Sequence, residues 1–273
     1  MDAPWLFGRA DDSPPPSPDL EPAQGDELIP EQIPSILGQR AVITYFCDGA
    51  RAPVTTVERQ DAPLPPARPD AYAICLTLDM TSGCGGTIWP AAEVLGAYIA
   101  SMMTRTHTTP DTHPWRGKTI VELGSGTGLI GFLVAQIGCG ATTWITDQVP
   151  MLPLMDSNTQ LNKERMVDAC HVAELNWGEP IPHGVPAKPD VLLLADCVYR
   201  EEAFQPLVDT MVELATPQTE ILFSYHKRRR ADKRFFAMLK KHFTYTHVED
   251  DDPVRRQAYN REGTSLMRIH RRS

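Results

Sequence analysis

The segment VELGSGTGLIG at residues 121–131 constrains the fold of this chain more than any other stretch. An apolar run ends at Leu123, a short loop rich in glycine follows, and the apolar run LIGFLVAQIG begins at Leu129. This order is typical of a buried strand, a tight loop and a buried helix. Glycine lets the backbone turn sharply and approach a ligand closely, and a helix start offers unpaired N–H groups. The segment therefore predicts a nucleotide-type cofactor site at the carboxyl end of a strand.

Short β-rich runs alternate with helical stretches from residue 119 to residue 270. Such alternation predicts an α/β domain with a doubly wound, mostly parallel sheet of seven strands that helices cover on both faces. The last two runs are joined by DDDPVRRQAYNREG, which has no helical pattern, so we expect them to form an antiparallel hairpin at the sheet edge. The expected strands are 119–123, 142–146, 170–175, 190–195, 220–225, 243–248 and 265–270.

The first 39 residues differ in composition from the rest of the chain. Eight acidic residues lie in residues 1–31 against Arg9 alone, and the stretch DDSPPPSPDLEP has almost no apolar side chains. Such a segment cannot bury enough surface to offset its loss of entropy on ordering, so we expect residues 1–39 to be a disordered, acidic, proline-rich tail. Residues 40–273 then form one domain. It opens at 40–80 with a small antiparallel β unit built from RAVITYF and AYAICLTLD.

Charge and cysteine usage narrow the class of protein. The formal net charge is −9 at pH 7, and most of it lies in the tail, so bulk charge argues neither for nor against nucleic acid. None of the six cysteines forms C-x-x-C or a His/Cys ligand spacing, which argues against a disulfide framework or a zinc site. No apolar run approaches the roughly 20 residues of a membrane-spanning helix, and the N-terminus is unlike a targeting peptide. We expect a cytoplasmic protein, with the nucleus open as an alternative.

Two cofactor classes fit the glycine loop taken by itself. Gly126, Gly128 and Gly131 match the G-x-G-x-x-G fingerprint of dinucleotide sites. Asp147, at the end of the next expected strand, could hold a ribose hydroxyl in either class. Glu122 before the loop gives E-x-G-x-G-x-G, which favours S-adenosylmethionine. That ligand has no pyrophosphate, but its amino-acid end and its ribose still require a bare backbone.

Three further motifs, together with the glycine loop, carry a family resemblance. TIWPAAEVLGAYI precedes the loop, LNWG at 175–178 follows the third expected strand, and ADCVY at 195–199 ends the fourth. The set resembles the seven-β-strand protein-lysine methyltransferases often called methyltransferase family 16, which have a Rossmann-like fold. SYHKRRRADKRFF at 224–236 is most similar to the fungal elongation-factor lysine methyltransferases of that family. The resemblance covers about residues 40–270 and implies a protein-lysine N-methyltransferase that uses S-adenosyl-L-methionine.

The resemblance implies roles for the residues that match these motifs. Trp89 would border the methionine part of the cofactor, Asp147 would bind the ribose hydroxyls, and Trp177 would pack near the adenine. Asp196 and Tyr199 match the D-x-x-Y signature beside the transferred methyl group, so they are the candidate catalytic residues. The implied substrate is a protein, with a translation elongation factor as the leading candidate, and we expect a monomer. The full set of implied cofactor contacts is Trp89, Gly124, Ser125, Gly126, Asp147, Trp177 and Ala195.

Methyl transfer from a sulfonium depends on alignment and exclusion of water, and it requires neither a metal nor a nucleophilic enzyme side chain. The attacking lysine must be neutral although its ordinary pKa is about 10.4, so the site must favour the neutral form or remove a proton. We expect Asp196 to orient the amine or accept its proton, and Tyr199 to wall the slot. ADCVY lacks the prolines of the N/D-P-P-Y/F/W motif, which is found in enzymes that methylate nucleobase amines, and this argues against a nucleic-acid substrate.

Several interpretations stay open at the level of the sequence. One basic run is either the solvated start of a helix or a docking patch for an acidic protein or RNA surface. The activity could instead be methylation of a small molecule or of another residue type, and the fold could serve a non-catalytic binding module. A dehydrogenase is a further alternative, which differs in being stabilised by NAD rather than by S-adenosylhomocysteine. The basic run comprises Lys227, Arg228, Arg229, Arg230, Lys233 and Arg234.

Overall fold

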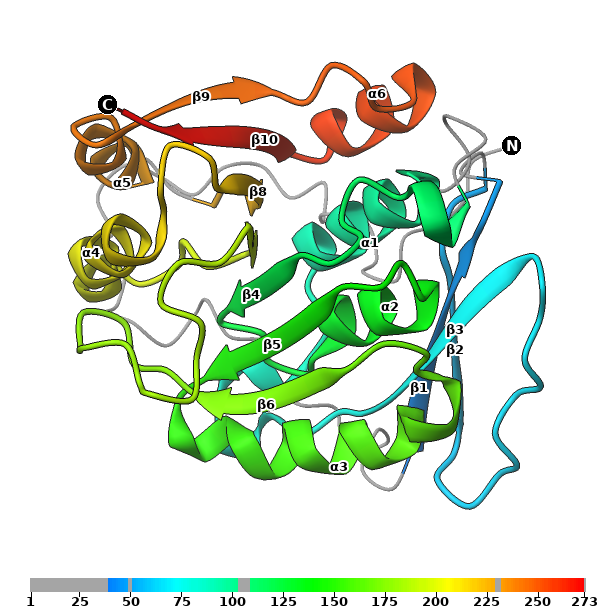
Figure 1. The fold of residues 1–273 in the computed structure, drawn as a ribbon. Coiled ribbons are helices and arrows are strands. Elements are labelled where there is room, and N and C mark those ends of the chain that lie inside the picture. The colour runs from blue at the N-terminus through cyan, green and yellow to red at the C-terminus, as the bar shows by residue number, and fades with distance from the viewer. Residues whose placement is uncertain (1–38, 49–50, 103–108, 229–231, 273) are drawn as a thin grey trace, which may run out of the picture.

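The computed structural model describes residues 39–48, 51–102, 109–228 and 232–272. Of the tail predicted over residues 1–39, residues 1–38 lie outside the described part, and Gln39 is the first residue of strand β1. Figure 1 shows a central sheet between helical layers, with a second, smaller sheet packed beside one of those layers.

The central sheet has seven strands in the order β6-β5-β4-β7-β8-β10-β9. The strands from β4 to β8 run parallel, whereas β10 is antiparallel to both β8 and β9. This confirms the predicted doubly wound, mostly parallel sheet of seven strands with an antiparallel edge. The strands are β4 (Thr119–Leu123), β5 (Thr142–Asp147), β6 (Cys170–Glu174), β7 (Val191–Ala195), β8 (Glu220–His226), β9 (Phe243–His247) and β10 (Thr264–Arg271).

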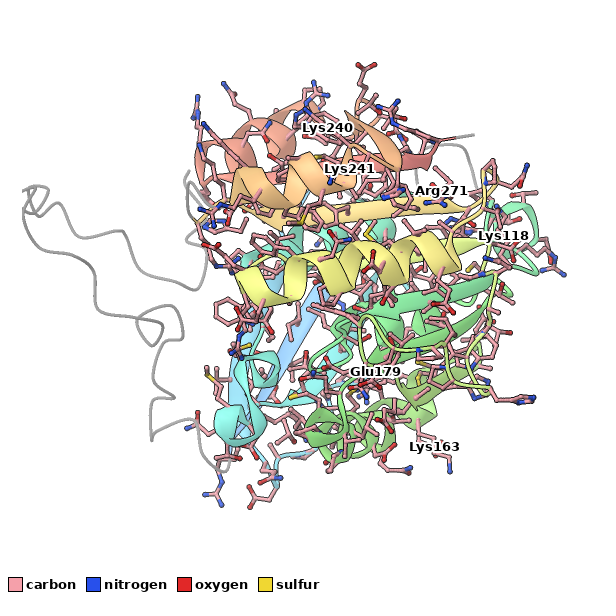
Figure 2. The ribbon with its side chains drawn as sticks, turned by 90° about the vertical axis from the view of Figure 1, so that its left-hand side faces the viewer. Lys118, Lys163, Glu179, Lys240, Lys241 and Arg271 are labelled. Atoms are coloured by element: carbon pink, nitrogen blue, oxygen red, sulfur yellow. The ribbon has the colours of Figure 1, made fainter. Side chains whose placement is uncertain are left out.

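Helices cover both faces of the central sheet, as the alternation of runs predicts (Figure 1). On one face lie α1 (Pro90–Met102) and α2 (Leu129–Ile137), with α3 (Leu152–Asn162) alongside β6. On the other lie α4 (Phe204–Leu214) and α5 (Asp232–Leu239), and Figure 2 shows the exposed Lys240 and Lys241 just after α5. Every residue of α2 is buried, which explains why its sequence is apolar throughout.

The expectation of no helix between the last two strands is wrong. Residues Pro253–Arg261 form helix α6. The side chain of Asp252 caps its start by accepting a hydrogen bond from the backbone N–H of Arg255 at 2.8 Å, and Pro253 suits the first turn. Only Tyr259 of this helix is buried, and its hydroxyl donates to Asp251 Oδ2 at 2.8 Å. One buried residue leaves no apolar period in the sequence, so the helix depends on its cap and on tertiary contacts.

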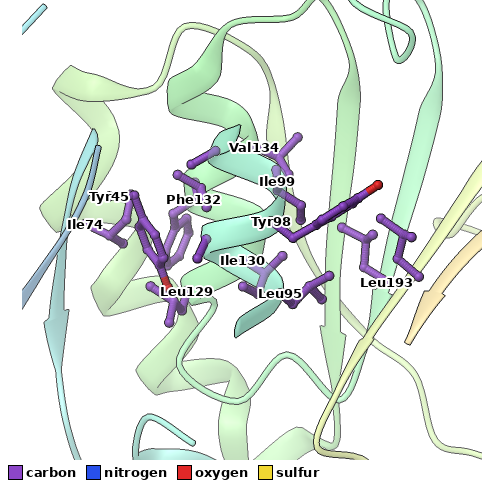
Figure 3. Packing of buried hydrophobic residues seen from close by; sticks show 14 of the residues in the cluster. Tyr45, Ile74, Leu95, Tyr98, Ile99, Leu129, Ile130, Phe132, Val134 and Leu193 are labelled. Atoms are coloured by element: carbon purple, nitrogen blue, oxygen red, sulfur yellow. The ribbon is translucent and has the colours of Figure 1, made fainter. Parts of the chain in front are cut away.

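The N-terminal β unit has three strands where the sequence predicts two. Its order is β2-β1-β3, with β1 (Gln39–Phe46), β2 (Val54–Arg59) and β3 (Ala71–Thr77), and both pairings are antiparallel. No residue of β2 is buried, which is why VTTVER lacks a recognisable apolar alternation. The unit packs on α1 and α2, and Figure 3 shows Tyr45 and Ile74 on one side of these helices with Leu193 of β7 on the other. The β extension and the central sheet therefore share one continuous core.

Side-chain amides tie the free edge of β3 to the main domain. Asn162 of α3 accepts a hydrogen bond from Cys75 N at 3.0 Å and donates to Cys75 O at 2.7 Å, as a neighbouring strand would do. Asn158 pairs with Thr77 in the same way, and its Nδ2 also donates to Thr127 O at 3.0 Å. Both asparagines are fully buried. The small sheet is thereby connected by hydrogen bonds to the glycine loop.

Candidate active site

A cavity of about 560 Å³ lies at the carboxyl ends of the parallel strands. Successive strands are added on one side of β4 as far as β6, and β7 then pairs with the other side of β4. Ligands of open α/β sheets bind outside the strand ends at such a topological switch point. All nine residues that the sequence implicates in cofactor binding or catalysis line this one cavity. The lining comes from segments 83–92, 122–130, 147–151, 175–177 and 195–206, and from Arg228.

The glycine loop connects β4 to α2 and forms one wall of the cavity. Gly124 and Gly126 have φ values of +65° and +54°, in the left-handed region that favours glycine. A Cβ on Gly126 would lie 2.5 Å from Gly85 O, and a Cβ on Gly124 would lie 2.8 Å from Trp177 Cζ2. The loop is held to β5 by the backbone N–H of Ser125, which donates to Thr146 O at 2.9 Å. The bare backbone is therefore required by the close approach of two other segments.

Asp147, the last residue of β5, lines the cavity and binds the glycine loop. Its Oδ2 accepts a hydrogen bond from Gly126 N at 2.8 Å, and its Oδ1 accepts one from Gln148 N at 2.8 Å. Burial raises the pKa of Asp147, and these two hydrogen bonds oppose that rise. The carboxylate thus fixes the loop and remains part of the cavity lining, where it can accept hydrogen bonds from a ligand.

Two tryptophans line the cavity. Trp89, just before α1, donates from Nε1 to Cys84 O at 2.9 Å. This hydrogen bond holds Cys84 and Gly85 in the wall of the cavity. Trp177, after β6, packs against Gly124. Both rings are only half-buried, so each presents a surface to the cavity.

The segment after β7 places Ala195, Asp196 and Tyr199 along the cavity. Asp196 has φ +61° and is the only non-glycine residue with positive φ among those that the structure describes. Its backbone N–H donates to Ser224 O at 2.9 Å, which anchors the turn to β8. Such a conformation costs free energy and is common at functional sites. Burial raises the pKa of Tyr199, and a hydrogen bond with the Cys84 side chain raises it further, so its hydroxyl stays protonated.

Arg228 forms a buried ion pair with Asp196, which the sequence did not predict. Its two terminal nitrogens each lie 2.5 Å from one carboxylate oxygen. The side chains of Arg228 and Asp196 are 13% and 2% exposed. Burial lowers the pKa of Arg228, but the hydrogen bonds and charge of Asp196 outweigh this effect and raise it overall. The Arg228 guanidinium therefore stays charged, and the pair is largely removed from water.

The basic run that contains Arg228 does not form a single surface. Arg229 and Arg230 lie outside the described residues, while Lys227, Lys233 and Arg234 are exposed and Arg234 pairs with Glu201 at 2.6 Å. Neither open interpretation, a solvated helix start or a docking patch, describes Arg228, because its charge points into the cavity. A run of like charges in sequence gave no signal that one member is buried.

Residues 83–85 also line the cavity without having been predicted. Gly85 lies against Gly126, and the Cys84 carbonyl accepts the Trp89 hydrogen bond. A signal was available, because the string GCGG directly precedes the TIW motif. Three glycines within four residues beside a tryptophan indicate a close backbone approach.

Glu122 on β4 is fully buried beneath the glycine loop and accepts a hydrogen bond from Gly131 N at 3.0 Å. Burial raises its pKa from 4.5 to about 8. At neutral pH the folded protein therefore holds this carboxyl mainly in its protonated form.

We expect the free energy of unfolding to fall between about pH 4.5 and about pH 8 in part because of Glu122. Below this window both states are protonated, and within it the unfolded chain loses a proton that the folded chain keeps. Burial also raises the pKa of Glu93, to about 7, and this lowers the free energy of unfolding with rising pH in the same way. Glu122→Gln should flatten the pH dependence, as measured by urea unfolding at several pH values. Glu174 is exposed, so Glu174→Gln is the control and should show the same pH dependence as the parent. An equal slope of unfolding free energy against pH in the two variants would show that Glu122 does not cause the dependence.

Neither a metal centre nor a membrane span is found in the part of the chain that the structure describes. No group of three or more His, Cys, Asp or Glu side chains in it is arranged to hold a metal ion. None of its helices combines the length and apolar character needed to cross a bilayer.

Comparison with known proteins gives consistent matches. Residues 70–242 match the family described as lysine methyltransferase. Protein-lysine N-methyltransferase EFM6 of Saccharomyces cerevisiae is 34% identical over 210 residues, which cover 70% of this chain and 82% of the relative. Protein N-lysine methyltransferase METTL21A of Danio rerio is 33% identical over 189 residues, covering 67% and 82%. EEF1A lysine methyltransferase 3 of Mus musculus is 31% identical over 179 residues, covering 65% and 72%.

Proposed function

We infer the activity of this chain from the premise that it belongs to the lysine methyltransferase family. It is a protein-lysine N-methyltransferase. The observation that carries the detailed proposal is the single cavity that joins the glycine loop, Asp147, Asp196 and Tyr199. In that cavity a cofactor and a lysine side chain can meet at the carboxyl ends of β4 and β7.

We propose S-adenosyl-L-methionine as the methyl donor. The cavity fits such a molecule because it offers a bare backbone cradle, a carboxylate and two aromatic rings. When bound, the donor supplies a sulfonium methyl group to a nitrogen lone pair, and the electrons of the broken C–S bond remain on sulfur. The proposed contacts are Trp89, Gly124, Ser125, Gly126, Asp147, Trp177 and Ala195.

The residues around Asp196 are proposed to receive the lysine side chain. Asp196 can accept an N–H of the amine, because each oxygen paired with Arg228 keeps a further lone pair. Tyr199 and Trp89 wall the slot, and their apolar rings disfavour the charged ammonium by desolvation. This arrangement aligns a neutral nucleophile and limits access of water, as methyl transfer requires.

We further propose a translation elongation factor as the protein substrate, because the mouse relative is named for EEF1A. The remaining proposals are a monomer, a cytoplasmic location, and one catalytic domain over residues 40–273 with the β extension at its start. The shared core between the extension and α1 and α2 supports a single domain.

Labelled methyl transfer tests the proposed function. Purified protein is incubated with labelled S-adenosylmethionine and a lysate of cells that lack it, and the labelled protein is identified by mass spectrometry. We expect methyllysine in a discrete acceptor protein, with elongation factor 1A tested directly as the first candidate. Label in small molecules or in other residue types would contradict the proposal.

Asp147→Ala is expected to weaken the binding of S-adenosylhomocysteine about 10-fold or more, because it removes charge-assisted hydrogen bonds to the proposed ribose hydroxyls. Calorimetry measures the affinity. Asp168→Ala is a matched control, since Asp168 accepts hydrogen bonds from Gly140 N and Ala141 N near the opposite end of β5. It should cost stability while leaving affinity unchanged. Equal affinity of the Asp147 variant and the parent would remove Asp147 from the cofactor site.

A further inference from the structure

The candidate catalytic carboxylate is already paired with a cation of the protein itself. Arg228 reaches from the end of β8 across to the end of β7 and binds both oxygens of Asp196. Both side chains line the cavity that Trp89 and Tyr199 also line. A lysine that enters this cavity therefore meets a neutral ion pair rather than a free negative charge.

Several contacts fix the guanidinium of Arg228 in the cavity wall. Its Cζ lies 5.2 Å from the centre of the Trp89 ring, and its Nη1 lies 3.4 Å from His226 O. Its backbone N–H donates to Asp232 Oδ2 at 3.1 Å, at the start of α5. Five N–H donors in a planar fork match a carboxylate geometrically, which lysine cannot reproduce. The arginine is therefore held in place by α5, β8 and the segment before α1.

The charge of the pair affects the protonation state of an incoming lysine. A carboxylate without a counter-ion stabilises an ammonium within about 4–6 Å and raises its pKa by about 1–3 units. The ammonium has no lone pair and cannot attack a methyl group. A buried Asp196 carboxylate alone would thus bind the unreactive form of the substrate.

We propose that Arg228 is a positioning residue that neutralises Asp196, so that the cavity accepts lysine as the neutral amine. This inference rests on the proposed function. The proton of the lysine is released to bulk water before the side chain is seated, and Asp196 then orients the amine through its remaining lone pairs. Arg228 does not touch the reacting atoms and acts through Asp196.

Other charged and titratable groups face the pair and are present in every variant. Burial and the Arg228 charge both lower the pKa of His226, which favours its neutral form. Burial also raises the pKa of Tyr225, whose hydroxyl donates to Asp232. The groups around the pair are Cys84, Cys197, Tyr199, Arg200, Tyr225, His226 and Asp232.

Four variants test the charge of the pair in a defined way. Arg228→Gln keeps a donor for Asp196 but leaves a net charge of −1, whereas Asp196→Asn leaves +1. The double variant carries neither charge and has the same net charge as the parent. Arg228→Lys keeps the cation without the planar fork. A structural role for Arg228 predicts that the double variant is at least as impaired as either single variant, whereas the proposal predicts partial rescue.

The measurement is the pH dependence of kcat for methylation of the acceptor protein at saturating S-adenosylmethionine, from about pH 6 to about pH 10. For Arg228→Gln we expect the midpoint to move up by about 1 unit or more, with a lower KM and with kcat recovering at high pH. Arg228→Lys and the double variant should return the midpoint toward that of the parent. The affinity for S-adenosylhomocysteine is measured for every variant by calorimetry.

Three outcomes would overturn the inference. An unchanged midpoint in Arg228→Gln would make the ion pair purely structural. A higher rate of that variant at every pH would mean that the arginine obstructs the substrate. No methyllysine from the parent at any pH would overturn the proposed function and the inference together. Thermal unfolding of the parent, the two charge-removing single variants and the double variant gives a further readout that is independent of activity. A loss of stability in the double variant equal to the sum of the two single losses would show that the pair does not exist in solution, and this would also overturn the inference.

Discussion

Asp196→Asn is expected to lower kcat/KM about 100-fold or more, the scale of loss when a group that aligns a reacting atom is removed. Asparagine keeps the size of the side chain and tolerates the left-handed backbone at φ +61°, so the turn after β7 should persist. The variant removes the negative charge and leaves Arg228 buried without its partner. The remaining positive charge repels a lysine ammonium, and the amine loses one of the two carboxylate oxygens that can orient it. The loss should ease as pH rises toward the ordinary lysine pKa of about 10.4.

A pH–rate profile beside the parent checks this expectation, with cofactor affinity measured separately. Breaking a buried ion pair costs about 3–5 kcal/mol, so the assay must run well below the unfolding midpoint of the variant. Asp190→Asn is a matched control, because Asp190 precedes the same strand at its opposite end and accepts hydrogen bonds from Thr119 N and Oγ1. It should affect stability but not turnover. Parental turnover of Asp196→Asn at every pH would eliminate Asp196 from the chemistry, and loss of cofactor binding would make it a structural residue.

Gly126→Ala is expected to weaken the binding of S-adenosylhomocysteine about 100-fold or more, equivalent to about 2.7 kcal/mol. The new Cβ would lie 2.5 Å from Gly85 O, which is a backbone atom and cannot rotate away as a side chain can. Either the glycine loop or residues 83–85 must shift, and both line the cavity. Left-handed strain adds about 1–2 kcal/mol for a residue with a Cβ.

Gly117→Ala introduces the same left-handed backbone strain without a steric clash. Gly117 has φ +70°, but a Cβ there meets no atom within 4 Å, and the residue lies outside the cavity lining. This variant should lose about 1–2 kcal/mol of stability and keep parental affinity. Calorimetry and urea unfolding of the two variants check the comparison. Equal affinity losses would mean that the effect comes from global destabilisation, and an unaffected Gly126→Ala would show that the close approach of the two loops is not needed for binding.

The family resemblance predicted most of the site residues, because these residues lie at strand ends. Carboxyl ends of neighbouring parallel strands meet at one edge of a sheet, so Asp147 after β5 and Asp196 after β7 had to converge on the glycine loop once the strand order followed the family. The roles of these residues in binding and catalysis stay predictions until the variants are measured.

The sequence by itself determined the central sheet, the buried helix after the glycine loop and the positions of the cavity-lining strand ends, because these depend on local patterns. The spacing of apolar residues and the placement of glycines determine structure over a few residues, so both can be recognised in the sequence. The exposed strand β2 and the helix α6 escaped notice because no residue of the first and only one residue of the second is buried.

Only the tertiary structure decided which charges and loops face one another. Arg228 and Asp196 are 32 positions apart, and one belongs to a basic run whose other described members are exposed. Gly85 and Gly126 come into contact only because the segment before α1 folds over the glycine loop. Ion pairing and close packing depend on distances between segments far apart in the chain, and these distances are set by the assembled core rather than by any local pattern.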